Sequence, residues 1–132
     1  MNQTGIRGLF AVAALYDFAI GLTFLLQGAK LFEASGVPQP NHWGYIHFGA
    51  LMLMVFGLMF AAIAFNPAAN RNLIPYGILL KLSYVGLVGY YWANEPTFPW
   101  LFKPFLVADL VMLVLFAVAY VALGNRRVNQ VA

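Results

Sequence analysis

Three charged residues lie near the middle of long apolar segments, and they are the residues best able to do chemistry. They are Asp17, Lys81 and Asp109. An isolated charge at the centre of a bilayer costs several kcal/mol, so we expect all three side chains to point inward and Lys81 to pair with one or both aspartates. Two carboxylates and one ammonium leave one negative charge if all ionise, so one carboxylate is expected to hold or share a proton, or to receive a cation. The cluster therefore predicts either a proton- or cation-carrying site or a buried ion-pair network that fixes helix order and rotation.

Helical spacing predicts which residues accompany these charges. Residues three, four or seven positions apart share one face of a helix. The predicted stripes are Asp17, Gly21, Phe24 and Gly28 in the first helix, and Gly77, Lys81, Tyr84, Val88 and Tyr91 in the third. The glycines would let a neighbouring helix approach, and the Tyr84 hydroxyl could serve a carboxylate. In the second helix, Gly57 and Ala61, with Gly49 two turns earlier, predict a further close contact between helices. Tyr16, next to Asp17, is expected to point about 100° away from it.

Four apolar stretches must position these side chains. They cover roughly residues 7–27, 42–65, 72–93 and 100–123. Each is close to the ~20 residues that cross ~30 Å of hydrocarbon as a helix. The connections between them are short and rich in turn-forming residues, and short connections make successive helices antiparallel neighbours. The sequence therefore predicts one transmembrane domain over residues 1–132, with an all-α fold: an antiparallel four-transmembrane-helix bundle of an integral membrane protein.

The composition excludes several classes of protein. Of the 132 residues, 63% are hydrophobic and 8% are charged, against about 25% charged residues in soluble domains. A net charge of +3 without a basic run longer than two residues does not suggest nucleic-acid binding. The chain has no cysteine, which rules out disulfides, covalent haem attachment through thiols, iron–sulfur ligation and thiol exchange.

Charges and turn residues also predict the orientation of the chain and some helix ends. Arg7, Arg71, Arg126 and Arg127 would lie on one side of the membrane, with only Lys30 and Lys103 on the other. Basic residues favour the cytoplasmic side, so both termini are expected there. The first helix is expected to continue past the membrane and to end at Gly36, and Asn41 is the expected N-cap of the second helix.

Aromatic residues gather at the opposite, outer boundary. The three tryptophans fall there, together with His47 and several tyrosines. The residues predicted to form an outer aromatic mouth are Trp43, His47, Tyr91, Trp92 and Trp100. Aromatic side chains often anchor a helix at the membrane interface. The alternative is an aromatic-walled mouth between the second, third and fourth helices that admits a flat or lipidic ligand.

The two histidines do not predict a haem or metal site. His42 and His47 are five residues apart, which separates them by about 140° around a helix, so both cannot reach one iron from the same side. Nor do Glu33, His42, His47 and Glu95 match a ligand pattern. We therefore expect no metal site, and we expect both histidines to lie at the membrane interface. The cofactor that stays open is a quinone or a bound lipid.

The end of the first helix carries a family resemblance. Residues 21–32 read Gly-Leu-Thr-Phe-Leu-Leu-Gln-Gly-Ala-Lys-Leu-Phe. This resembles the first-helix signature of DoxX-like small membrane proteins, with matches at Gly21, Gly28 and Lys30. The resemblance implies a four-helix bacterial or archaeal protein, and hence a place in the bacterial inner membrane. It also implies a link to quinone-coupled sulfur oxidation or to membrane oxidoreductase complexes.

Three functions from different classes remain open at this point. The chain could be an accessory or quinone- or lipid-associated subunit of a membrane complex, which its small size and lack of catalytic motifs favour. It could be a small proton-coupled transporter built as a homo-oligomer, which the charged cluster favours. It could also be a membrane-embedded redox or lipid-modifying enzyme, although no residue set assigns a reaction. Whether it is an enzyme is left open by the sequence.

Overall fold

The fold consists of four long helices. The computed structural model describes the backbone of residues 1–131 and the side chains of residues 1–125. Its α-helices are α1 (Gln3–Ala34), α2 (Gly44–Phe65), α3 (Ile74–Asn94) and α4 (Lys103–Val131). Two short 3-10 turns, η1 (Arg71–Leu73) and η2 (Trp100–Phe102), precede α3 and α4. No strand occurs in this part of the chain, so the prediction of an all-α four-helix bundle is confirmed.

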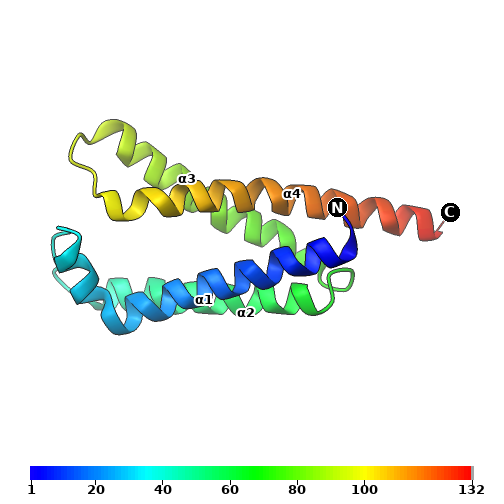
Figure 1. Cartoon of the computed structure of the whole chain (residues 1–132), viewed down its shortest axis with the longest axis horizontal. Coiled ribbons are helices and arrows are strands. Elements are labelled where there is room, and N and C mark those ends of the chain that lie inside the picture. Colours follow the sequence, from blue (N-terminus) through cyan, green and yellow to red (C-terminus); the bar gives the residue numbers. More distant parts are fainter. Residues whose placement is uncertain (132) are drawn as a thin grey trace.

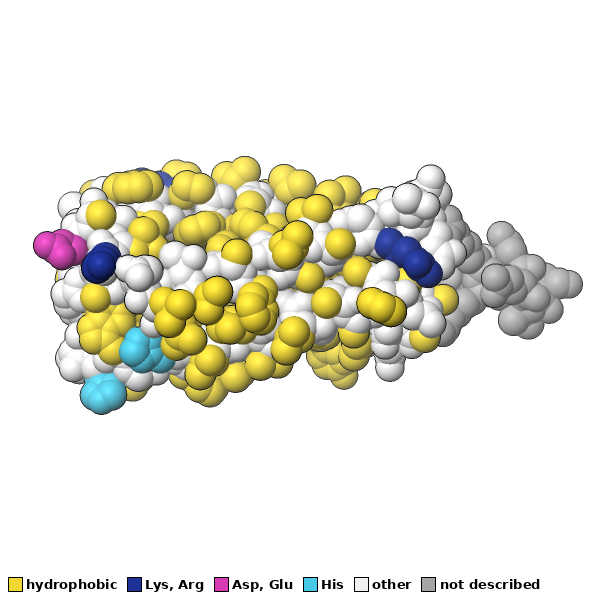
Figure 2. All heavy atoms as spheres, turned by 60° about the horizontal axis from the view of Figure 1, so that its bottom comes forward, with side chains coloured by type: hydrophobic (Ala, Val, Ile, Leu, Met, Phe, Trp, Pro, Cys, Tyr) yellow, Lys and Arg dark blue, Asp and Glu magenta, His cyan; other side chains and the backbone are white. Residues whose placement is uncertain are grey.

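Each helix is long and apolar enough to cross a bilayer. The candidate spans are Gln3–Ala34, Gly44–Phe65, Arg71–Asn94 and Trp100–Asn125. Figure 2 shows apolar side chains covering the middle of one face, with charged side chains near both of its ends and histidines near one of them. In water this surface would be unfavourable, whereas hydrocarbon accepts apolar surface on every side.

The four helices form two hairpins. Helix α1 packs closely along α2 and α3 along α4, while contacts between the two pairs are fewer (Figure 1). Both chain ends and the connection over 66–73 lie at one end of the molecule, which we call the termini end. The connections over 35–43 and 95–102 lie at the opposite end, which we call the loop end. At the loop end the two hairpins are further apart than at the termini end (Figure 1).

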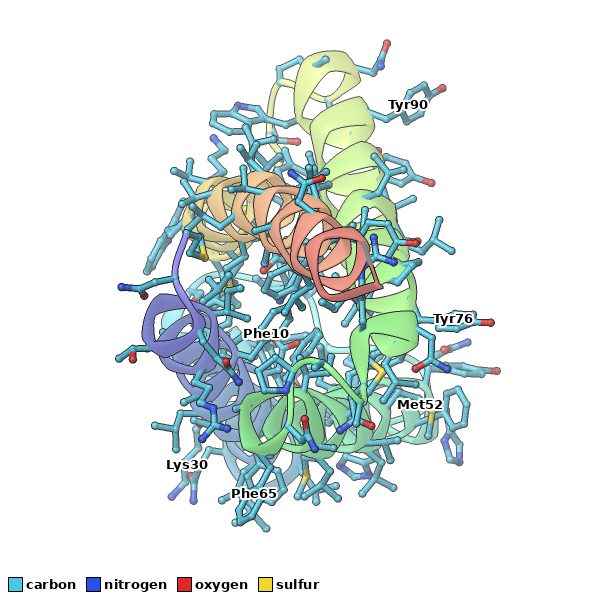
Figure 3. All side chains as sticks on the ribbon, turned by 90° about the vertical axis from the view of Figure 1, so that its right-hand side faces the viewer. Phe10, Lys30, Met52, Phe65, Tyr76 and Tyr90 are labelled. Atoms are coloured by element: carbon cyan, nitrogen blue, oxygen red, sulfur yellow. The ribbon has the colours of Figure 1, made fainter. Side chains whose placement is uncertain are left out.

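The hydrophobic core fills the termini end. Its centre is an aromatic cluster of Phe10 from α1, Phe60 from α2 and Phe116 from α4, all fully buried. The Phe10 and Phe116 ring centroids are 4.7 Å apart, and those of Phe60 and Phe116 are 5.1 Å apart. Figure 3 shows Phe10 pointing between the helices, while Phe65 and Tyr76 point outward. Three helices from two hairpins are thus joined by one apolar cluster.

Glycines set the close approach of α1 to α2. A Cβ added at Gly21 would lie 2.5 Å from the Ala50 carbonyl oxygen, and one added at Gly57 would lie 3.0 Å from the Ala14 carbonyl oxygen. The helix–helix contact predicted at Gly57 is therefore confirmed. Gly49, predicted to belong to the same contact, instead faces open space: nothing lies within 4 Å of a Cβ built there.

Arg71 joins the start of α3 to α4 at the termini end. Its Nε donates a hydrogen bond to the Tyr120 carbonyl oxygen at 3.0 Å. Its guanidinium carbon lies 3.7 Å from the centroid of the Tyr120 ring, a cation–π geometry. The side chains of Arg126 and Arg127, counted above for orientation, lie outside the described residues.

The structure corrects several helix boundaries. Helix α1 starts at Gln3 rather than residue 7, since the Asn2 side chain accepts a hydrogen bond from the Gly5 amide at 2.7 Å. It continues to Ala34 and ends as predicted at Gly36, which has a φ of +70°. The backbone at Gln27 is non-helical, so the helix is kinked where none was predicted.

The expected N-cap of α2 was wrong. Helix α2 begins at Gly44, too far along the chain for Asn41 to cap it. The His42 side chain does the equivalent work one residue later: its Nδ1 accepts a hydrogen bond from the Gly44 amide at 2.9 Å. An imidazole nitrogen can satisfy a free amide at a helix start as a carboxamide oxygen would.

Candidate functional site

The three intramembrane charges meet inside the bundle. Lys81 Nζ lies 2.8 Å from Asp17 Oδ1 and 3.0 Å from Asp109 Oδ1. The exposed fraction is 1% for Asp17, 1% for Lys81 and 7% for Asp109. The predicted pairing of Lys81 with one or both aspartates is therefore confirmed, and it involves both, because each contact is within hydrogen-bonding distance.

Helical spacing brings the charges together. Asp17 continues the buried stripe of α1 that contains Phe10 and Ala13, and Asp109 continues the buried stripe of α4 that contains Met112 and Phe116. Lys81 does the same in α3, at four residues from Gly77. The buried stripes that form the core at the termini end therefore also place the three charges, at the side of the core nearer the loop end.

Lys81 links the two hairpins. Its bond to Asp109 stays within the α3–α4 pair, whereas its bond to Asp17 crosses to the α1–α2 pair. Its ammonium also lies 5.2 Å from the Tyr16 ring centroid and 5.7 Å from the Phe60 ring centroid. Aromatic faces attract cations at such distances, so two carboxylates and two aromatic rings surround the Lys81 ammonium.

Two buried oxygen atoms beside this cluster have no hydrogen-bond partner. They are Asp17 Oδ2 and the Tyr16 hydroxyl, considering the residues that the structure describes. Buried polar atoms are nearly always satisfied in native proteins, and those that are not call for a water, an ion or a ligand. Both residues line the pocket described next, but these two atoms themselves have almost no accessible surface, so a ligand would reach them through a shift of the neighbouring side chains.

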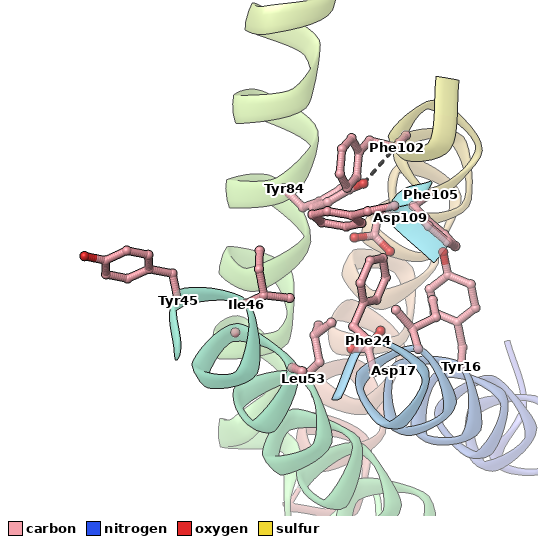
Figure 4. Close-up of a pocket in the computed structure, with 14 residues that line it drawn as sticks. Tyr16, Asp17, Phe24, Tyr45, Ile46, Leu53, Tyr84, Phe102, Phe105 and Asp109 are labelled. Carbon is pink, nitrogen blue, oxygen red and sulfur yellow. Dashed lines mark hydrogen bonds between the residues drawn. The ribbon is translucent and has the colours of Figure 1, made fainter. Parts of the chain in front are cut away.

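An apolar pocket lies on the loop-end side of the charged cluster, between the two hairpins (Figure 4). It has a volume of about 340 Å³. Its lining residues are Tyr16, Asp17, Ile20, Phe24 and Phe32 of α1; Tyr45, Ile46, Gly49, Ala50 and Leu53 of α2; Tyr84 of α3; and Phe102, Phe105 and Asp109 of η2 and α4. Half of these residues are aromatic. The pocket reaches the surface beside the first turns of α2, where Tyr45 is 72% exposed.

The two carboxylates form the polar floor of the pocket. Asp17 and Asp109 line it, whereas Lys81 does not and lies behind them. The remaining walls are apolar or aromatic, apart from tyrosine hydroxyls. A molecule in the pocket would therefore meet hydrocarbon and aromatic rings along its length and acidic groups at its inner end.

The predicted outer mouth lies elsewhere. Trp43 packs behind the pocket wall, with its ring 5.4 Å from that of Phe32, and the ring of His47 lies beside Trp43 at 6.0 Å. The other three predicted residues, Tyr91, Trp92 and Trp100, are exposed on the surface at the loop end. None of the five lines the pocket, so the structure does not bring them together as its mouth.

The tyrosines are placed differently from what the sequence suggested. Tyr84 lines the pocket, but its hydroxyl donates to the Phe102 carbonyl oxygen at 3.0 Å and not to a carboxylate (Figure 4). Tyr16 was expected to point away from Asp17. It lines the same pocket, however, with its ring centroid 6.3 Å from that of Phe105.

The donor atoms do not suit a metal ion. Among the described residues, no three His, Cys, Asp or Glu side chains lie close enough together to hold one. Asp17 and Asp109 already share an ammonium, and the pocket above them is mostly apolar. This combination suits an organic molecule with a small polar group better than a hydrated cation.

Fold and surface together define the class: this is a small multi-pass membrane protein with four candidate membrane-spanning helices and an ion-paired polar centre. Comparison with known proteins finds no family model, no curated protein and no solved structure that matches the chain.

Proposed function

We propose that the protein binds an amphipathic molecule from the bilayer, of the lipid or quinone class, in the pocket between its two hairpins. It would do so as an accessory subunit of a membrane complex, in a bacterial inner membrane with both termini in the cytoplasm. The observation that carries the proposal is the pocket with an apolar wall and a polar floor. The resemblance of residues 21–32 to DoxX-like proteins points in the same direction.

The dimensions of the pocket support a small-molecule ligand. Ligand pockets in proteins usually measure about 300–1,000 Å³ and combine apolar walls with a few polar groups. The volume of about 340 Å³ lies within this range. The ring or head of a membrane-soluble molecule would fit, and its tail could leave beside the first turns of α2. A polar group on that head would lie near Asp17 Oδ2 and the Tyr16 hydroxyl, two buried atoms without a hydrogen-bond partner among the described residues.

The proposed role as a subunit rests on the short connections and the apolar surface of the described chain. The described connections between helices are short, and the exposed residues of the helices are largely apolar. Such a surface can contact lipid or the helices of another membrane protein, including a second copy of this chain. Within the described part of the chain, a soluble partner would find short loops at either end.

Native mass spectrometry of protein released from a mild detergent tests ligand binding, with lipid and quinone extraction alongside. We expect an adduct in fixed ratio to the protein. Gly49→Phe is the informative variant, because Gly49 lines the pocket and a Cβ there meets no atom. Its ring can occupy the pocket without disturbing the backbone, so the adduct should disappear.

The matched control is Gly86→Phe. Gly86 is also an exposed helical glycine with open space around a Cβ, but it lies outside the pocket. This variant should keep the adduct. A wild-type protein without any adduct, or an adduct that survives Gly49→Phe unchanged, would contradict the proposal.

A second candidate function is a proton-coupled carrier working as a homo-oligomer. It is favoured by one observation, the excess of two carboxylates over one ammonium at the pocket floor. Proton relays in membranes use such groups. Proteoliposomes with an internal pH dye would show proton movement that depends on a solute and is lost in Asp17→Asn. Proton movement that is unchanged in Asp17→Asn would exclude this candidate.

A further inference from the structure

We propose that the ligand of this pocket carries a protonated amine, so that the site selects membrane-soluble amines over neutral molecules of the same shape. This inference rests on the proposed binding function and names the chemical class of the ligand. It comes from three observations: the charge balance of the floor, the unused oxygen of Asp17 and the aromatic walls.

The charge balance favours a cation at the floor. Both carboxylates line the pocket, and their single counter-ion, Lys81, lies behind them. Each carboxylate offers one oxygen to Lys81, so the ammonium is shared between them. The side of the cluster that faces the pocket is therefore negative when both aspartates are ionised, and a bound ammonium would restore neutrality in a place shielded from water.

The unused oxygen gives that ammonium a specific partner. Asp17 is 1% exposed, and its Oδ2 has no hydrogen-bond partner among the described groups. The oxygens of an ionised carboxylate accept and do not donate, so the partner of an ionised Asp17 must be a donor. A quinone or ester carbonyl cannot fill this role while Asp17 is ionised. An amine can, and a bond between an ammonium and a carboxylate is stronger than one between neutral groups.

The walls also suit an organic cation. Tyr16, Phe24, Tyr84 and Phe105 lie around the floor of the pocket (Figure 4). Aromatic faces attract ammonium groups, and the same rings accept the hydrocarbon part of an amphipathic amine. An inorganic cation would have to lose its water without gaining enough oxygen ligands in exchange. The pocket therefore fits an amine attached to an apolar body.

The test compares two probes that differ only in the head group, n-decylamine and n-decanol. Binding is measured by isothermal titration calorimetry on wild-type protein in nanodiscs of phosphatidylcholine, with empty nanodiscs as the blank. We expect the amine to bind at least about ten times more tightly than the alcohol, because its contact with the floor is charge-assisted. Asp17→Asn should remove this preference, because it should weaken the binding of the amine much more than that of the alcohol.

Two controls locate the effect. Gly49→Phe should weaken both probes, and Gly86→Phe should weaken neither. The comparison on wild-type protein needs no variant, so it decides the question even if Asp17→Asn does not fold. Equal binding of the two probes, or tighter binding of decanol, would overturn the amine assignment and leave the proposed pocket intact. If neither probe binds, both the amine assignment and the proposed function fail.

Discussion

Removing the shared ammonium should be far more harmful than removing either carboxylate. In Lys81→Met, both carboxylates lose their partner at once, although they are almost completely buried. Breaking a buried ion pair by deleting one partner costs about 3–5 kcal/mol. We therefore expect the free energy of unfolding to fall by at least that amount. In Asp109→Asn, by contrast, the 2.8 Å bond between Lys81 and Asp17 remains and the excess negative charge is gone. That change should cost about 1 kcal/mol or less.

The assay is unfolding of the purified variants by increasing SDS in mixed micelles, followed by tryptophan fluorescence. Lys81→Met should unfold at a clearly lower fraction of SDS than Asp109→Asn. Adding Asp17→Asn and Asp109→Asn to Lys81→Met removes all three charges and should recover most of the loss, because neutral groups are cheaper to bury than unpaired charges. If Lys81→Met and Asp109→Asn unfold at the same fraction of SDS, the three charges do not form a buried network.

Three further predictions concern groups outside the ion pairs. Gly21→Ala should lower the free energy of unfolding by about 1–3 kcal/mol in the same assay, because its Cβ would press against the α2 backbone. The control Gly86→Ala should be neutral or stabilising by about 0.5–1 kcal/mol, and equal effects of the two variants would mean that α1 and α2 do not meet at Gly21. Arg71→Ala should cost about 1–2 kcal/mol through the lost contacts with α4, and full stability in this variant would remove Arg71 as a link between helices. Tyr84→Phe should cost about 1 kcal/mol and speed proteolysis near Phe102, whose carbonyl loses its donor; an unchanged digestion pattern would contradict that role.

The helices and the charged cluster were predictable because the bilayer leaves few alternatives. Apolar segments of membrane-spanning length must be helical where lipid surrounds them. Charged side chains within them must face inward and pair, which is why Asp17, Lys81 and Asp109 were expected to meet, and they do. The glycine contact at Gly57 followed from the same need of helices to pack closely.

The pocket was not predictable to the same degree, because it depends on how two hairpins tilt against each other. Tryptophan is a marker of the membrane interface, so the predicted mouth followed Trp43, Trp92 and Trp100. The walls are instead mostly Phe and Tyr side chains, whose types do not distinguish a pocket from lipid contact. Tyr16 was missed because its direction was judged from α1 alone. The Tyr16 side chain contacts Phe105 of α4, so it also faces the space between the two hairpins.

Local details of the chain were missed for a different reason. The kink at Gln27 has no proline and no glycine–serine pair to announce it. It occurs one residue before Gly28, whose face is covered by the Trp43 ring: a Cβ there would lie 3.0 Å from the indole. The end of α1 is thus positioned by a side chain from the following connection, a tertiary contact that the local sequence does not encode.

Photolabelling tests most directly the central claim, that a ligand from the bilayer occupies the pocket between the hairpins. The probe is an alkyl amine with a diazirine near its head group, added to protein in phosphatidylcholine nanodiscs. The account predicts saturable labelling of Gly49–Leu53 and of the turn around Phe105, suppressed by excess n-decylamine and by Gly49→Phe but not by Gly86→Phe. Labelling restricted to outward residues such as Leu15 and Phe65, or unaffected by Gly49→Phe, would contradict it.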